Sequence, residues 1–180
     1  MIILFEGARC TGKTTLSRML VTNLKAAGFP AEGWKAERGE NPFDDMMETI
    51  HSDFSDTSKL WVADRFHLTE YVNSFADGRV PDKADLWRKT VLIDRLLSGG
   101  DVFLAFMMSS SAARLNRLEE EKREEPIGPA YMNALWVDTV RRSELPKIGI
   151  FSNTKMDLIQ ARRFLLTFAK AHWDKAHTIP

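Results

Sequence analysis

One short stretch near the amino terminus constrains this 180-residue chain more than any other. Residues 7–14 read Gly-Ala-Arg-Cys-Thr-Gly-Lys-Thr and match the pattern G-x-x-x-x-G-K-[ST] at every fixed position. The apolar run 1–5 precedes this stretch, and apolar side chains at helical spacing follow it as far as Gly28. A buried strand, a glycine-rich loop and a helix in this order predict a phosphate-binding loop, here called the phosphate loop. The alternative is an accidental match in an ordinary strand-turn-helix unit.

The chemistry of the phosphate loop predicts a nucleoside triphosphate as its ligand. Backbone N–H groups and the positive end of the following helix are expected to surround phosphate oxygens. Lys13 would neutralise the outer phosphates, and Thr14 would offer its hydroxyl to Mg²⁺. The residues expected to bind the cofactor are Gly7, Ala8, Arg9, Cys10, Thr11, Gly12, Lys13, Thr14 and Thr15.

Composition narrows the classes of partner and compartment. The 25 basic and 25 acidic side chains cancel, so no global charge attracts the protein to nucleic acid or to an anionic membrane. No apolar stretch approaches membrane-spanning length. The single cysteine, Cys10, cannot form an internal disulfide, which is consistent with a reducing compartment. The phosphate loop lies so close to Met1 that we expect no cleavable signal peptide and a cytoplasmic protein.

Helical patterns alternate with short apolar runs along the rest of the chain. Strands are predicted at residues 1–5, 32–36, 59–63, 102–107 and 147–151. Helices are predicted after the phosphate loop, at about 42–50, 66–77, 82–98, 109–125 and 130–142, and after residue 153. Five strands, each followed by helix, predict a single α/β domain with a five-stranded parallel sheet covered on both faces. Together with the phosphate loop, this arrangement is similar to the three-layer fold of phosphate-loop NTPases, and we expect a helical lid at about 110–128.

In such sheets ligands bind beyond the carboxyl ends of the strands, which directs attention to Asp64 and Arg65. A carboxylate in the position of Asp64 can hold Mg²⁺ together with Thr14, and its alternative role is to cap the following helix. The guanidinium of Arg65 suits a phosphate or carboxylate ligand, and its alternative is a surface ion pair.

Other polar groups are expected at neighbouring strand ends. Glu37 and Arg38 follow the second strand, where a carboxylate can accept a hydroxyl proton and a guanidinium can bind a phosphate. Phe66 could stack on a base, although core packing is the interpretation we favour for its ring. Asn153 opens a segment that resembles the guanine-reading N-K-x-D signature with one extra residue. Because no D-x-x-G follows an earlier strand, we expect this segment to line the base of ATP, with Asn153 or Thr154 capping the last helix.

The charged segment 114–125 carries two arginines on one face, Arg114 and Arg117, three residues apart. Arginines on a mobile flap can close over a triphosphate and stabilise the transferring phosphoryl group. The alternative is a solvated helix held by ion pairs, which we prefer for residues 119–125.

Four motifs together resemble the thymidylate kinase and deoxynucleoside kinase group, and most closely its small phage-type members. They are Phe5-Glu6-Gly7 before the loop, Glu37-Arg38-Gly39, Asp64-Arg65-Phe66 and Arg114-x-x-Arg117. The resemblance implies that Asp64 assists the metal and that the two lid arginines clamp the donor phosphates. It implies that Arg65 binds the phosphate of the acceptor nucleotide or supports the reacting centre. Two departures are the reversed order of Glu37 and Arg38, and Arg9 where many thymidylate kinases have aspartate.

Our leading hypothesis is an ATP- and Mg²⁺-dependent kinase that acts on a nucleoside or nucleoside monophosphate. The proposed catalytic residues are Lys13, Asp64, Arg65, Arg114, Arg117 and Glu37. The proposed acceptor-binding residues are Arg38, Arg65 and Phe66. Two alternatives are a kinase for a hydroxyl of DNA or RNA and an ATP-binding protein without catalysis. Because the resembled group is commonly dimeric, a homodimer is one expected oligomeric state.

Overall fold

The computed structural model describes residues 1–35, 41–78 and 82–177 as a three-layer α/β domain. The strands are β1 (Ile2–Gly7), β2 (Ala31–Lys35), β3 (Leu60–Asp64), β4 (Val102–Met108) and β5 (Lys147–Phe151). The helices are α1 (Lys13–Ala26), α2 (Pro42–His51), α3 (His67–Ala76), α4 (Lys83–Ser98), α5 (Ser111–Glu120), α6 (Pro129–Arg142) and α7 (Lys155–His177). Within these ranges, no helix combines the length and the apolar character needed to cross a membrane.

The five strands form one parallel sheet in the order β2-β3-β1-β4-β5. All six residues of β1 are buried at its centre, as expected for a strand covered on both faces. Phe5 pairs with Asp64 of β3, and Gly7 pairs with Met107 of β4. This register brings the phosphate loop and Asp64 to the same edge of the sheet.

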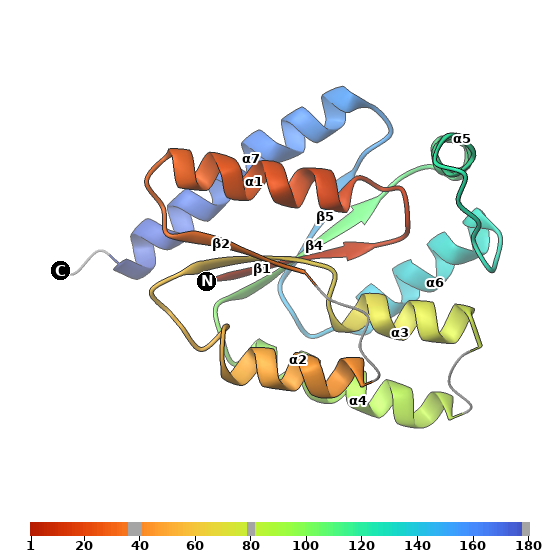
Figure 1. The fold of residues 1–180 in the computed structure, drawn as a ribbon, viewed down its shortest axis with the longest axis horizontal. Coiled ribbons are helices and arrows are strands. Elements are labelled where there is room, and N and C mark those ends of the chain that lie inside the picture. The colour runs from red at the N-terminus through yellow and green to blue at the C-terminus, as the bar shows by residue number, and fades with distance from the viewer. Residues whose placement is uncertain (36–40, 79–81, 178–180) are drawn as a thin grey trace.

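Successive residues of β1 face two separate hydrophobic cores. Leu4 belongs to a core shared with α2, α3, α4 and α6, whereas Phe5 belongs to a core shared with α1 and α7. Figure 1 shows these two helix groups on opposite sides of the sheet. On α1, Leu16, Leu20 and Leu24 recur every four residues and are fully buried. The predicted architecture, with helices on both faces of a parallel sheet, is confirmed.

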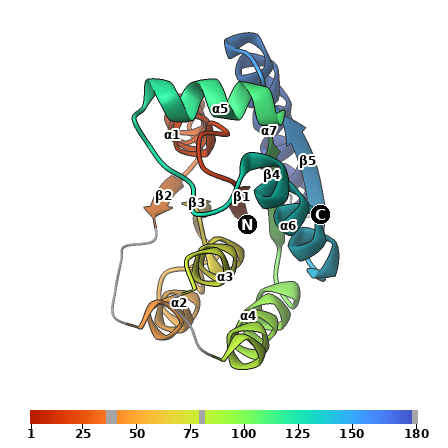
Figure 2. The ribbon, with the colours of Figure 1, turned by 90° about the vertical axis from the view of Figure 1, so that its right-hand side faces the viewer.

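One predicted helix is shorter in the structure than in the sequence analysis. The helix expected to reach residue 125 ends at Glu120, because Lys122 adopts a left-handed conformation with φ of 49°. The amide of Arg123 donates to Leu118 O at 2.9 Å and that of Lys122 to Glu119 O at 3.1 Å. These two bonds form a Schellman C-cap, a motif that usually has glycine in the left-handed position. Residues 121–128 are therefore an irregular segment between α5 and α6, which we call the strap (Figure 2).

Candidate functional site

The phosphate loop wraps around the side chain of Lys13. The ammonium group donates to Gly7 O at 2.7 Å and to Ala8 O at 2.5 Å. The hydroxyl of Thr11 also donates to Ala8 O, at 2.9 Å. Gly12 precedes α1 with φ of 88°, so the loop enters the helix through a left-handed residue. The lysine is thus held at the centre of the loop, the place where the sequence analysis predicts that it contacts phosphates.

Steric contacts explain why the two fixed positions of the motif are glycine. Gly7 has φ of 139°, and a Cβ there would lie 2.3 Å from the carbonyl oxygen of Met107. At Gly12 a Cβ would lie 2.9 Å from Leu158 of α7. Both positions also have a positive φ, which side chains rarely tolerate. The loop therefore needs glycine both for its backbone shape and for its contacts with β4 and α7.

Groups around Lys13 shift the pKa of its side chain in both directions. Burial, and after it the nearby Arg65 cation, lower the pKa of its ammonium group from 10.5 to about 7. Asp64 and Glu6 act in the opposite direction. An anion arriving in the loop would favour the protonated form, because opposite charge at close range stabilises it.

Thr14 and Asp64 meet across the end of the loop. The threonine hydroxyl donates to Asp64 Oδ2 at 2.6 Å. The other oxygen, Oδ1, is buried and has no hydrogen-bond partner in the described part of the chain. A hydroxyl and an unpaired carboxylate oxygen are ligands that suit Mg²⁺. Among residues 1–35, 41–78 and 82–177 no group of three His, Cys, Asp or Glu residues could hold a metal, so phosphate and water would complete such a site.

Glu6, rather than Asp64, caps the helix that follows β3. Its buried carboxylate accepts from the amides of Phe66 at 3.0 Å, Leu68 at 3.1 Å and Thr69 at 3.1 Å, and from the Thr69 hydroxyl. Burial raises the pKa of this carboxyl group above its ordinary range. Sequence analysis gave Glu6 no role of its own, although a charged residue in an apolar strand signals a buried polar contact.

Arg65 and Phe66, the two residues after β3, have different environments. Arg65 has φ of 76°, its amide donates to Phe5 O at 3.0 Å, and its charge acts on Lys13. The ring of Phe66 is fully buried, with its centroid 5.4 Å from that of Phe54. The ring therefore packs in the core, the interpretation favoured from the sequence, and the assignment of Phe66 to the acceptor site is wrong. Glu37 and Arg38 lie outside the described residues, so their predicted roles stay predictions.

Arg117 joins the lid to the phosphate loop. Its guanidinium donates to Cys10 O at 2.9 Å and to Asn153 O at 2.7 Å. It thus links α5, the loop and the connection between β5 and α7. In this position Arg117 lies beside the loop that is expected to hold the donor phosphates.

Asn153 organises the start of the lid. Its side-chain oxygen accepts from the amide of Ser110 at 2.9 Å and from the hydroxyl of Ser109 at 3.0 Å. Thr154, one of the two predicted caps of the last helix, accepts from the amide of Asp157 at 3.2 Å. Ser110 caps α5 in the same way, through the amide of Ala113. Asn153 therefore contributes to the site through its backbone carbonyl and through the position of α5.

Arg114 is fully buried at the base of the lid. Its guanidinium donates to Pro129 O at 3.1 Å, to Asn133 of α6 and to Glu125 of the strap. The strap also contacts the phosphate loop directly, because Arg9 donates to Glu124 O at 3.0 Å. In this structure Arg114 is therefore paired with a carboxylate of the chain itself.

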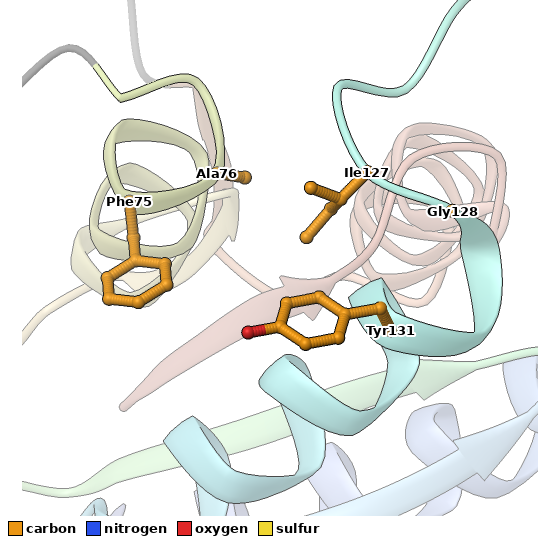
Figure 3. A pocket seen from close by; sticks show the side chains of 5 residues that line it. All are labelled: Phe75, Ala76, Ile127, Gly128 and Tyr131. Atoms are coloured by element: carbon orange, nitrogen blue, oxygen red, sulfur yellow. The ribbon is translucent and has the colours of Figure 1, made fainter.

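A cavity of about 410 Å³ opens between α3, the strap and α6. Its lining residues are Phe75, Ala76, Ile127, Gly128 and Tyr131. Figure 3 shows the side chains of Phe75, Ile127 and Tyr131 around one space, with the Tyr131 hydroxyl turned toward Phe75. Two aromatic rings and an aliphatic side chain suit a flat apolar group. No sequence pattern pointed to this cavity, because its walls come from three separate elements.

Comparisons with known proteins support the fold. No family model matches the chain, and no curated protein sequence matches it either. Among solved structures, the chain is similar to the YorR protein from Bacillus subtilis, crystallised in complex with phosphorylated GDP. The two chains share 13% sequence identity, each is covered over 100% of its length, and the TM-score is 0.69. The α/β fold of this chain is thus one that a nucleotide-binding protein also uses.

Proposed function

We propose that this protein is an ATP- and Mg²⁺-dependent kinase that transfers a phosphoryl group to a nucleoside or nucleoside monophosphate. The observation that carries the proposal is the arrangement around Lys13. Its ammonium group is buried inside a glycine-rich loop, at the edge of the sheet where Thr14 contacts Asp64. The likeness to a protein crystallised with phosphorylated GDP supports a nucleotide as the ligand.

The donor would bind with its phosphates in the phosphate loop. Lys13 and Arg117 would contact the phosphates, and the amino end of α1 would add the partial positive charge of a helix terminus. Thr14 and Asp64 would hold Mg²⁺, which neutralises charge on the donor phosphates. The acceptor oxygen would bond to the γ-phosphorus while the bond from that phosphorus to the bridging oxygen breaks and ADP departs. The proton of an acceptor hydroxyl would pass to Glu37, the carboxylate predicted to accept it. Arg65, next to Lys13, would orient the acceptor.

The acceptor would extend from Arg65 along α3 toward the cavity at the far end of that helix. Phe75 and Tyr131 would contact its base, because aromatic side chains bind flat rings through their faces. The site assigned to the base thus moves from Phe66, which is buried, to this cavity. A matched pair of variants tests the assignment: Phe75→Ala should raise the KM of the acceptor, whereas Phe164→Ala, at an exposed position of α7, should not.

The test of the proposed function is phosphoryl transfer in a panel of acceptors. Purified protein is incubated with γ-labelled ATP, Mg²⁺ and, separately, nucleosides, nucleoside monophosphates and DNA. We expect one nucleoside or nucleoside monophosphate to become labelled. Labelling of DNA alone would favour the alternative of a polynucleotide kinase. Binding of ATP without transfer to any acceptor would contradict the proposal that the protein is an enzyme.

Lys13→Ala is the decisive variant for the donor site. Loss of a charged hydrogen-bond donor should weaken ATP binding by roughly 10- to 100-fold. Lys25→Ala is the matched control, because Lys25 lies on the same helix but is 52% exposed and pairs only with Glu32 among the described residues. Unchanged turnover in Lys13→Ala would show that the loop does not carry the chemistry.

A further inference from the structure

The strap buries a carboxylate that the proposed reaction does not use. The side chain of Glu125 is only 2% exposed. One oxygen, Oε1, accepts from Arg114, and the other, Oε2, is buried without a hydrogen-bond partner among the described residues. Leaving a buried charged oxygen unpaired costs free energy. The position of Glu125 therefore depends on the positive charges around it rather than on full hydrogen bonding.

Those positive charges belong to the phosphate site. Arg114 contacts Glu125 directly, and the cations of Arg9 and Lys13 lie near enough to oppose the rise in its pKa that burial causes. Arg9 also donates to the backbone of Glu124, the preceding residue. On the other side, Arg114 is one of the cations that lower the pKa of Lys13. The carboxylate thus lies in a field created by the cations that a polyphosphate would meet.

The strap is held at both ends, and in its middle Arg9 donates to Glu124 O and Arg114 to Glu125. At the α5 end, Arg117 donates to Cys10 O and Asn153 O. At the α6 end, Arg114 donates to Pro129 O. Between these points the strap residues other than Glu125 and Ile127 are exposed. Glu125 is therefore the buried charged group that ties the strap to the lid beside the phosphate loop.

We propose that Glu125 acts as an internal anion, whose carboxylate pairs with the Arg114 guanidinium until a polyphosphate binds. The bound polyphosphate then displaces Glu125 and pairs with Arg114 in its place. The proposal rests on the proposed function, because it needs the phosphate loop to bind a triphosphate. It goes further in assigning a competitor for that ligand within the chain itself. Because Ile127 and Gly128 lie two and three residues after Glu125 and line the cavity, release of the strap would also change the acceptor side.

The test compares three proteins by calorimetry: the unmodified chain, Glu125→Gln and Glu124→Gln. Each is titrated with Mg²⁺-ATP and with Mg²⁺-tripolyphosphate, a probe without base or sugar. Glu125→Gln removes the competing charge but keeps its shape, so we expect both probes to bind about tenfold more tightly. Glu124 has an exposed side chain and only its backbone contacts Arg9, so Glu124→Gln should bind like the unmodified protein.

The two proposals fail in different ways in this experiment. No binding of either probe to the unmodified chain would overturn the proposed function. If the unmodified chain binds both probes and Glu125→Gln binds them with the same or weaker affinity, only the proposal of an internal anion is overturned. Weaker binding would show instead that Glu125 holds Arg114 in place for the phosphates.

A second measurement needs no variant, which matters because removing half of a buried ion pair can destabilise a protein. Lys122 and Arg123 are exposed in the strap and give trypsin two sites for cleavage. We expect Mg²⁺-tripolyphosphate to speed cleavage after these residues, because displacement of Glu125 releases the strap. Slower or unchanged cleavage would contradict displacement.

Discussion

Two of the carboxylates that are buried beside the phosphate loop, Glu6 and Glu125, lie in regions of opposite character. Glu6, at the junction of β1 and α3, accepts hydrogen bonds from three amides and one hydroxyl. Glu125, in the strap, has one paired and one unpaired oxygen. Burial raises the pKa of both groups. The comparison shows that burial alone does not fix a carboxylate in its position. The number of hydrogen bonds that it accepts decides whether another anion can displace it.

The junction is accordingly the fixed part of the site, and the strap is the part that can move. Backbone amides of a helix end cannot follow a carboxylate that departs, so displacement of Glu6 would leave them unsatisfied. Arg114 can exchange one anion for another, because a guanidinium binds carboxylate and phosphate alike. Four variants and conditions test this comparison.

The largest effect is expected at Gly7, in the fixed part. Gly7→Ala should lower the free energy of unfolding by roughly 3 kcal/mol, because the new Cβ meets Met107 O and the backbone is strained. Gly128→Ala is the matched control in the strap, where a Cβ meets no atom within 4 Å and φ is −57°. It should change stability by less than about 1 kcal/mol. Urea unfolding measures both, and equal losses would contradict the comparison.

Glu6→Gln tests the same junction through its hydrogen bonds. The amide nitrogen of glutamine cannot accept from the amides that now face Glu6, so we expect a loss of about 2 kcal/mol. Thr69→Val removes only the hydroxyl donor and should cost about 1 kcal/mol. Unfolding curves for the two proteins give the ranking. If the Glu6→Gln protein is as stable as the unmodified chain, Glu6 does not stabilise the junction, and the contrast with Glu125 is wrong.

Lys13 connects the two regions and predicts a pH dependence of binding. Its pKa is lowered from 10.5 to about 7, so the ligand-free group is mostly neutral above that pH. Polyphosphate binding should restore its charge and take up about one proton, and affinity should fall nearly tenfold per pH unit above about pH 7.5. Calorimetry in buffers of different ionisation enthalpy measures the uptake. Absence of uptake above that pH would show that Lys13 stays charged without ligand.

The smallest effect on stability is expected for Arg117→Ala, at the edge of the strap. Among the described residues this side chain donates to two carbonyl oxygens, and we expect water to take its place there, so the loss should be about 1 kcal/mol or less. Trypsin cleavage at Lys122 and Arg123 should nevertheless become several-fold faster, because the strap loses one of its ties. A loss of stability as large as that of Glu6→Gln would place this end of the strap in the fixed part.

The phosphate loop illustrates what sequence patterns predict well. Its fixed glycines and Lys13 are local requirements, since the shape of the loop depends on the backbone freedom of those residues. The five strands and the helices between them were likewise predicted from periodicity, within a few residues at each end. Thr154, which caps the last helix, was one of two candidates predicted from residue type.

Errors arose where a side chain had two environments to choose from. Phe66 was named among the acceptor-binding residues although core packing was favoured for its ring, and the ring does lie in the core beside Phe54. The end of α5 was placed at residue 125, because a left-handed lysine at Lys122 has no reliable signal in the sequence. Neither outcome is encoded by neighbours in the chain, since both depend on what packs against the segment.

The sequence by itself determined the order of elements, the phosphate loop and the charges available at the edge of the sheet. These follow from backbone preferences and from the alternation of apolar and polar residues, which are local properties. Only the tertiary structure decided which carboxylates those charges meet: Asp64 with Thr14, Glu6 with the amides of α3, and Glu125 with Arg114. Such pairings join residues up to 62 or 63 positions apart, and they depend on the register of the sheet and the path of the strap.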